Sequence, residues 1–288
     1  MVWLNAIIQG ILLGGLYALY TAGLSVVFGV MRLVNLAHGD LSVIAAYLAL
    51  VFADDFGLNP LVSVAVVVPA MALIGFVLQV TILNFTLDSA LAPLVATFGL
   101  AVITQNVLLD QFSADSQGLD AGTIETKSIH VTSQISIGWF PLITLIVAVG
   151  LLGGLQFLTR YTPLGRALRA TADDRRAAEL VGIDNRRVYG YALAISLATV
   201  AIAGIFLGIR TIFTPTTGPV RLIFAFEAVI IGGLGSLWGT LVGGVVLGVA
   251  QTIGAQVSPG WGVLSGHLVF LAVLLVRPRG LFARPEPA

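Results

Sequence analysis

RYTPLGRALRATADDRRAAELVGIDNRR, residues 160–187, is a charged stretch in a chain that is otherwise mostly apolar. It holds seven of the fourteen Lys and Arg residues found among 288 residues. Apolar residues make up 58% of the whole chain and charged residues 10%, against about a quarter charged in soluble domains. We therefore expect an integral membrane protein, with this stretch outside the hydrocarbon.

The charge pattern predicts on which side each loop lies, because short loops rich in Lys and Arg stay cytoplasmic. In the loop 159–187, seven arginines face four acidic residues, which leaves a net charge of +3. This loop is therefore expected in the cytoplasm, together with the C-terminus, whose tail carries three arginines. Residues 111–139 hold three acids and one Lys and are expected outside. Within them, the alternation in SIHVTSQISIG predicts a strand or hairpin.

Apolar segments of about 20 residues predict membrane-spanning helices. We expect one all-α transmembrane domain over residues 1–288, with eight or nine crossings. Nine would place the N-terminus outside and eight inside. Two segments, 38–53 and 222–237, are short and rich in Gly or polar residues, which favours discontinuous or re-entrant helices. The candidate spans are 4–30, 38–53, 61–84, 90–110, 140–158, 188–209, 222–237, 240–257 and 262–276.

Start and stop signals predict two short helices inside the charged loop. Thr162 followed by Pro163 is a good helix start. Asp173 or Asp174 can cap a second helix, RRAAELV, which Gly182 ends. Anchoring to lipid headgroups would use the arginines but needs no capped helix. A short helix with small residues and flanking charge instead fits a groove on a cytoplasmic partner.

Residues 162–183, TPLGRALRATADDRRAAELVGI, resemble the coupling-helix loop of ABC-importer permeases, specifically the branched-chain amino acid permease family with its LivH-type membrane subunit. GLYALYTAGLSVVFGVMRLVNLAHGD (15–40) and EAVIIGGLGSLWGTLVGGVVLG (227–248) resemble two further signatures of that family. Arg176 departs from the Glu of the broader importer consensus, and no Ile-x-Leu-Pro follows. The resemblance implies that ATPase subunits contact the loop, and the candidate coupling residues are Arg169, Asp174, Arg175, Arg176, Ala177, Ala178, Leu180 and Gly182.

Several kinds of chemistry are excluded by what the sequence lacks. The only lysine, Lys127, has no glycine-rich approach, so the chain has no Walker A site. There is no cysteine, no metal-ligand spacing and no nucleophile elbow, so we expect neither an enzyme nor a cofactor or metal in this chain. A net charge of zero removes any case for nucleic-acid binding by a basic surface. ATP would be used by partner subunits.

Ionisable groups at membrane depth are costly and therefore candidates for function. Two clusters occur, in MRLVNLAHGD and in RLIFAFEAVIIGG. In the functional interpretation they shape or gate a translocation path. The alternatives are that Arg32 snorkels to the interface, Asp40 caps a helix and Glu227 satisfies freed backbone, while His267 is a lone packing or interface residue. The path candidates are Asn35, His38, Asp40, Glu227, Gly232 and Gly233.

Three pairs of glycines are spaced four residues apart, which predicts close approach of helix backbones. This approach can serve internal packing, which we favour, or a subunit interface. The pairs are Gly10 with Gly14, Gly239 with Gly243, and Gly244 with Gly248.

The resemblance implies a permease subunit of an ATP-driven importer for branched-chain or related hydrophobic amino acids, multi-pass in a bacterial plasma (inner) membrane. Its implied partners are ABC ATPases, a second homologous permease in a heterodimer, a soluble extracytoplasmic substrate-binding protein and membrane lipid. Urea, short amides or other small acids are alternative substrates within the family. An ion-coupled secondary transporter would explain broken helices, but not an ordered Arg-rich helix pair.

Overall fold

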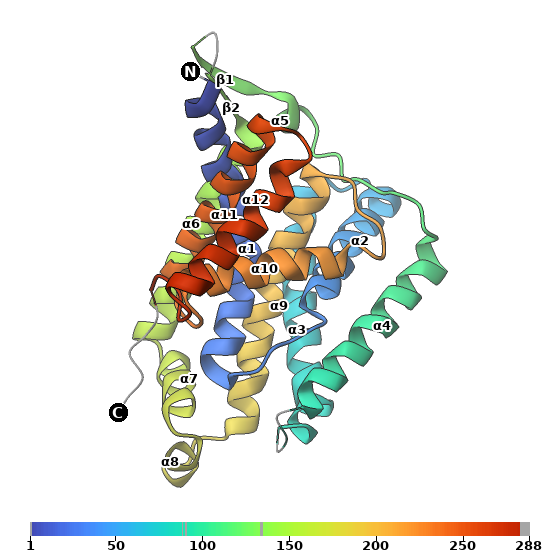
Figure 1. Cartoon of the computed structure of the whole chain (residues 1–288). Helices are drawn as coiled ribbons and strands as arrows, with labels where there is room; N and C mark the ends of the chain where they lie inside the picture. The colour runs from blue at the N-terminus through green and yellow to red at the C-terminus, as the bar shows by residue number, and fades with distance from the viewer. Residues whose placement is uncertain (1, 88, 90, 133–134, 283–288) are drawn as a thin grey trace.

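The computed structural model describes residues 2–87, 89, 91–132 and 135–282 (Figure 1). The predicted all-α class is confirmed, since the described residues form helices with a single small hairpin. In chain order the elements are α1 (Val2–Met31), α2 (His38–Phe56), α3 (Pro60–Thr81), the 3-10 helix η1 (Leu83–Phe85), α4 (Ala92–Phe112), α5 (Thr123–Thr126), β1 (Ser128–Thr132), β2 (Ile135–Gly138), α6 (Trp139–Tyr161), α7 (Pro163–Asp173), α8 (Arg175–Leu180), α9 (Asn185–Arg210), α10 (Gly218–Gly232), α11 (Leu237–Val257) and α12 (Trp261–Val276).

Six helices in the described part of the chain are long and apolar enough to cross a membrane, namely α1, α3 extended through η1, α4, α6, α9 and α11. The apolar helix α12, at 16 residues, is shorter. Helices α1 and α9 form the centre of the bundle. In each of these helices, 83% and 78% respectively of an apolar stretch of 18 residues is buried inside the protein, against 22% for α3 and 28% for α4. The expected total of eight or nine crossings stays a prediction.

Glycines let the central helices approach closely. Gly244 and Gly248 of α11 lie against the backbone of α1 at Gly10 and Gly14. A Cβ added at Gly14 would stand 2.5 Å from the Cα of Val245, a distance that real side chains do not tolerate. The second glycine pair of α11, Gly239 and Gly243, faces α10 in the same way. The prediction of close approach is confirmed, and all three pairs serve packing within the chain.

The two short segments have different forms. Helix α2 follows residues 32–37, which lead from the end of α1 back into the protein, and its first half is buried. Helix α10 lies nearly across the direction of the long helices in Figure 1. The predicted span 222–237 has the wrong bounds, because α10 runs from Gly218 to Gly232, and Gly233, where φ is +103°, is its C-cap. A glycine with positive φ, which other residues rarely adopt, ends the helix there.

The stretch 111–139 contains the hairpin, in which Ser128–Thr132 pairs antiparallel with Ile135–Gly138. The hairpin lies at the same end of the molecule as the start of α1 (Figure 1). A hydrogen bond from Gln9 Nε2 to the Ser136 carbonyl, 2.7 Å long, joins the two. Helices α7 and α8 lie at the opposite end, so the charged loop and the hairpin are separated by the length of the bundle.

Candidate functional site

Helix α7 starts where the sequence predicts and packs by one face. The Thr162 hydroxyl accepts a hydrogen bond from the Gly165 amide at 3.0 Å, and Pro163 is the first helical residue. Leu168 is buried and packs with Val188 and Ala192 of α9. A small apolar core thus fixes α7 to the base of α9, while Arg166 and Asp173 of the same helix are exposed.

Helix α8 is capped at both ends by local contacts. Of the two predicted capping acids, Asp174 is the cap, and its carboxylate accepts from the amides of Arg176 and Ala177 at 2.8 and 3.0 Å. At the other end Gly182 has φ of +86°. The Ile183 amide donates to the Ala178 carbonyl at 3.0 Å, which is the Schellman pattern. Six residues therefore form a helix that would be too short to persist without its caps.

One side of α8 is open. Leu180 is 89% exposed and Val181 77%, and Arg176 and Ala177 are also exposed. We call these four residues the α8 face. Adjacent large apolar side chains exposed to this degree, on a helix outside the long apolar spans, are typical of a surface that another protein covers.

The structure divides the predicted coupling residues into outward and inward groups. Ala178 is only 2% exposed, so it packs against its own chain and cannot belong to the open surface. Arg169 donates to the Thr159 carbonyl at the end of α6. Arg175 lies with its guanidinium carbon 5.9 Å from the centre of the Tyr189 ring in α9. These inward residues hold the unit in place.

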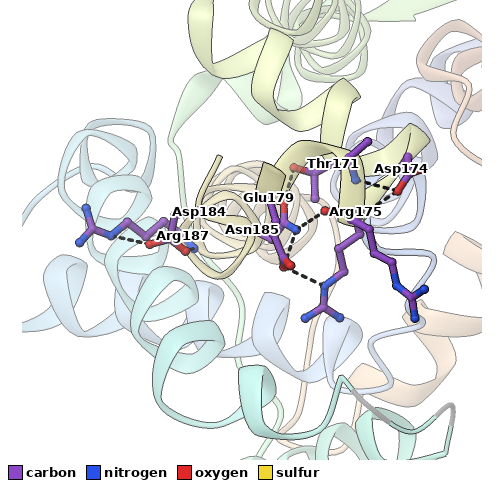
Figure 2. A network of polar contacts seen from close by, with 9 residues as sticks. Thr171, Asp174, Arg175, Glu179, Asp184, Asn185 and Arg187 are labelled. Carbon is purple, nitrogen blue, oxygen red and sulfur yellow. Dashed lines mark hydrogen bonds and ion pairs between the residues drawn. The ribbon is translucent and has the colours of Figure 1, made fainter. Parts of the chain in front are cut away.

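Asn185, the first residue of α9, joins α7, α8 and α9 (Figure 2). It is 2% exposed, and its Oδ1 accepts from the Thr171 hydroxyl of α7 at 2.9 Å. Its Nδ2 donates to the Arg175 carbonyl and to Glu179 Oε1, both at 2.8 Å. The Arg175 Nε lies 3.6 Å from the same Glu179 oxygen. The α7–α8 unit is therefore attached by hydrogen bonds to a central helix of the bundle.

Sequence reasoning missed Asn185, Thr171 and Glu179 as functional candidates. An Asn directly after Asp184 at a helix start looks like an ordinary capping residue. Asp184 is in fact the cap of α9, since it accepts from the Arg187 amide at 3.2 Å. No sequence spacing predicts that Asn185 reaches back fourteen residues to Thr171.

The first polar cluster in the membrane region lies where α1, α2 and α4 meet. Asn35 Oδ1 accepts from the Ala37 amide at 3.0 Å and shapes the turn before α2. His38 Nε2 is 2.9 Å from the Tyr20 carbonyl of α1, and Asp40 accepts from Gln105 Nε2 of α4 at 2.9 Å. All three predicted residues are buried. Asp40 is the acidic residue in the first turn of α2, and its bond to Gln105 also joins α2 to α4.

The second cluster lies on α10 and α12. Glu227 Oε1 is hydrogen-bonded to His267 Nδ1, and the His267 ring stacks on Phe224 with centroids 6.0 Å apart. The interpretation of His267 as a lone residue is therefore wrong, and Glu227 binds this histidine in place of freed backbone near Gly232. Sequence patterns could not reveal the pair, because forty residues separate the partners.

The two clusters stay apart along α10. Asp40 adjoins Gly218 at the start of this helix, whereas Glu227 comes nine residues later, about 13 Å along the axis. Gly232 packs on the backbone of Gly239, and Gly233 forms the turn that ends α10. In the chain itself, these two glycine candidates make packing and turn contacts.

In the described residues, no group of three or more His, Asp or Glu side chains could hold a metal ion. What the arrangement offers is mechanical: an exposed short helix, a hydrogen-bonded connection to the central helix α9, and buried polar groups where helices cross.

Known proteins are similar to this chain over nearly its full length. The family described as "Branched-chain amino acid transport system / permease component" matches residues 6–276. The high-affinity branched-chain amino acid transport system permease protein BraD of Pseudomonas aeruginosa is 27% identical, covering 99% of this chain and 97% of BraD. The corresponding protein LivH of Escherichia coli K12 is 27% identical over 99% of this chain and 96% of LivH. The permease LivM of the same organism is 24% identical, over 94% of this chain and 69% of LivM.

Proposed function

Because the chain belongs to the family of permease components of branched-chain amino acid transport systems, we propose that it is the membrane-spanning subunit of an ATP-driven importer for branched-chain or related hydrophobic amino acids. The names of BraD and LivH support this substrate class. The chain contributes no ATPase site, and ATP is used by partner subunits that contact the α8 face.

The observation that carries the proposal is the α8 face, exposed on a helix that Asn185 ties to α9. Helix α9 is largely buried and packs against α1, α2 and α3. A displacement of α8 by an ATPase would therefore move α9, and with it the helices that surround the membrane polar groups. Coupling of this kind needs no covalent chemistry in the chain. It needs a stiff connection, which caps, apolar packing and hydrogen bonds supply.

The translocation path is proposed to pass the buried polar groups. Asn35, His38 and Asp40 lie where α1, α2 and α4 meet, and Glu227 lies on α10. Polar side chains at membrane depth are functional candidates because hydrocarbon offers them no hydrogen bonds. Gly232 and Gly233 end α10 without a bulky side chain, which supports a role in letting that helix change its angle.

The remaining partners follow from orientation. With the α7–α8 end and the C-terminus in the cytoplasm, the hairpin and the N-terminus lie outside. The outer loop 111–139 would then meet a soluble substrate-binding protein. Similarity to both LivH and LivM of one organism supports a heterodimer of two homologous permeases in a bacterial plasma membrane.

Reconstitution tests the proposal. The chain is placed in liposomes with a second permease, ATPases and a binding protein, and uptake of L-leucine is measured. Uptake should require ATP and all subunits, and urea or acetamide should not replace L-leucine. Uptake by the chain alone, driven by a proton or sodium gradient, would instead identify an ion-coupled transporter. ATP-driven uptake of urea or acetamide in place of L-leucine would move the substrate to the alternative class.

A further inference from the structure

A cavity of about 80 Å³ lies between α7, the last third of α1 and the turn that joins α10 to α11. Roughly 10–15 Å³ of such space holds one water, so this cavity has room for several waters or a small organic group. Asp173, one of the residues that line it, is exposed. None of the residues that line it belongs to the two membrane polar clusters described above.

Two opposite charges line the cavity from the same helix. Arg169 and Asp173 are four residues apart on α7, which places them on one side of that helix. Arg169 donates to the Thr159 carbonyl, which also lies at the cavity. Within the described ranges Asp173 makes no ion pair or side-chain hydrogen bond. The cavity therefore offers one held cation and one free carboxylate, with no net charge.

A buried hydroxyl without a partner also lines the cavity. Ser25 of α1 is 1% exposed, and its Oγ has no hydrogen bond within the part of the chain that the structure describes. Buried polar atoms are normally paired. The rest of the wall is largely apolar, including Val26, Leu168 and Leu237.

We propose that this cavity binds a small zwitterion with an apolar side chain, an amino acid, from the side of the membrane where α8 lies. Asp173 holds the ammonium group and Arg169 the carboxylate, Ser25 supplies a further hydrogen bond, and the apolar wall receives the side chain. The substrate class rests on the proposed function, but the site is new. The bound molecule would bridge α7 to α1 and so restrain the helices that carry coupling, which makes it a product-sensing site.

Binding of radiolabelled L-leucine, measured by equilibrium dialysis, tests the site. The sample is the complex of permeases and ATPases without binding protein. Arg169→Gln should weaken L-leucine binding at least about tenfold, because it removes one charge-assisted hydrogen bond. Ala172→Leu fills the cavity and should weaken L-leucine binding at least as much. Arg166→Gln is the matched control, because Arg166 is exposed on the same helix and does not line the cavity.

Two analogues test the need for both charges. 4-Methylpentanoate lacks the ammonium group and 3-methylbutylamine lacks the carboxylate, so each should bind at least about tenfold more weakly than L-leucine. Equal binding of either analogue, L-leucine binding that survives Ala172→Leu, or no saturable binding to the wild-type complex would overturn the proposal. If Ala172→Leu fails to assemble, Ser25→Val probes the same cavity from α1.

Uptake measured on the same preparations separates the two proposals. ATP-driven L-leucine uptake without cavity-dependent binding would leave the proposed function standing and remove the site. Cavity-dependent binding without any L-leucine uptake would do the reverse.

Discussion

The α7–α8 unit and the membrane polar clusters both hold hydrogen-bonded polar groups, but their partners come from different distances along the chain. In the unit, most partners are near in sequence. The Asp174 carboxylate accepts from the amides two and three residues later, and Arg175 pairs with Glu179 one helical turn later. In the membrane region, Asp40 bonds Gln105 and Glu227 bonds His267, partners 65 and 40 residues away. In a loop, water can hydrogen-bond to polar groups. In hydrocarbon no water is present, so polar groups need hydrogen-bond partners within the protein.

The difference teaches where each region tolerates change. In the α7–α8 unit, substitutions of exposed residues should leave the fold intact, whereas substitutions of buried residues should destabilise it. The membrane clusters should be sensitive on all sides, with loss of either partner leaving the other unpaired.

The largest effect is expected from Ala178→Glu. Ala178 is 2% exposed, so the new carboxylate would be buried without a partner, at a cost of about 3–5 kcal/mol. The α7–α8 unit should unfold locally, which increased protease cleavage between residues 163 and 184 of the detergent-solubilised chain would detect.

Ala177→Glu is the matched control, since Ala177 is exposed one residue earlier. Its cleavage pattern should equal that of the wild type. If the α8 face docks on an ATPase, a complex assembled with this variant should still hydrolyse ATP, with uptake reduced several-fold. Cleavage that rises equally in both variants would show that the two sides of α8 do not differ.

Asp40→Leu should produce the next largest effect. It removes the acceptor of Gln105 Nε2 at membrane depth, and an unpaired buried donor costs about 1–3 kcal/mol. The melting temperature of the purified chain should fall. Asp40→Asn retains an acceptor oxygen and should stay close to the wild type. Equal losses in both variants would mean that the charge, and not the hydrogen bond, matters there.

Asn185→Ala should cost less stability, about 1–2 kcal/mol, because water can reach some of the freed groups at the base of α9. Coupling should suffer more than stability. ATP hydrolysis by the assembled complex should continue while uptake per ATP falls several-fold. Unchanged uptake per ATP would show that the connection to α9 does not pass through this amide.

Arg187→Gln should have the smallest effect. The Arg187 Nε lies 3.0 Å from Asp184 Oδ2, but both side chains are largely exposed, and such pairs contribute at most about 1 kcal/mol. Melting temperature and uptake should both match the wild type within error. A marked loss of uptake with an unchanged melting temperature would instead extend the docking surface beyond the α8 face.

Features governed by neighbouring residues could be predicted from the sequence. The starts at Thr162 and Asp174, the stop at Gly182 and the glycine pairs of α1 and α11 all appear in the structure. Caps involve atoms within about four residues, and a glycine spacing repeats with the helix turn itself. Composition predicted an integral membrane protein, and the length of its apolar segments predicted helices.

Tertiary structure alone decided which polar groups meet. That Ala178 faces inward, that Asn185 joins three helices and that His267 pairs with Glu227 depend on how elements far apart in sequence pack. The bounds of α10 belong here too, because the Gly233 turn is completed by contacts with residues 280–282. Local sequence dictates a helix and its ends, whereas a buried hydrogen bond also requires the partner that folding brings to it.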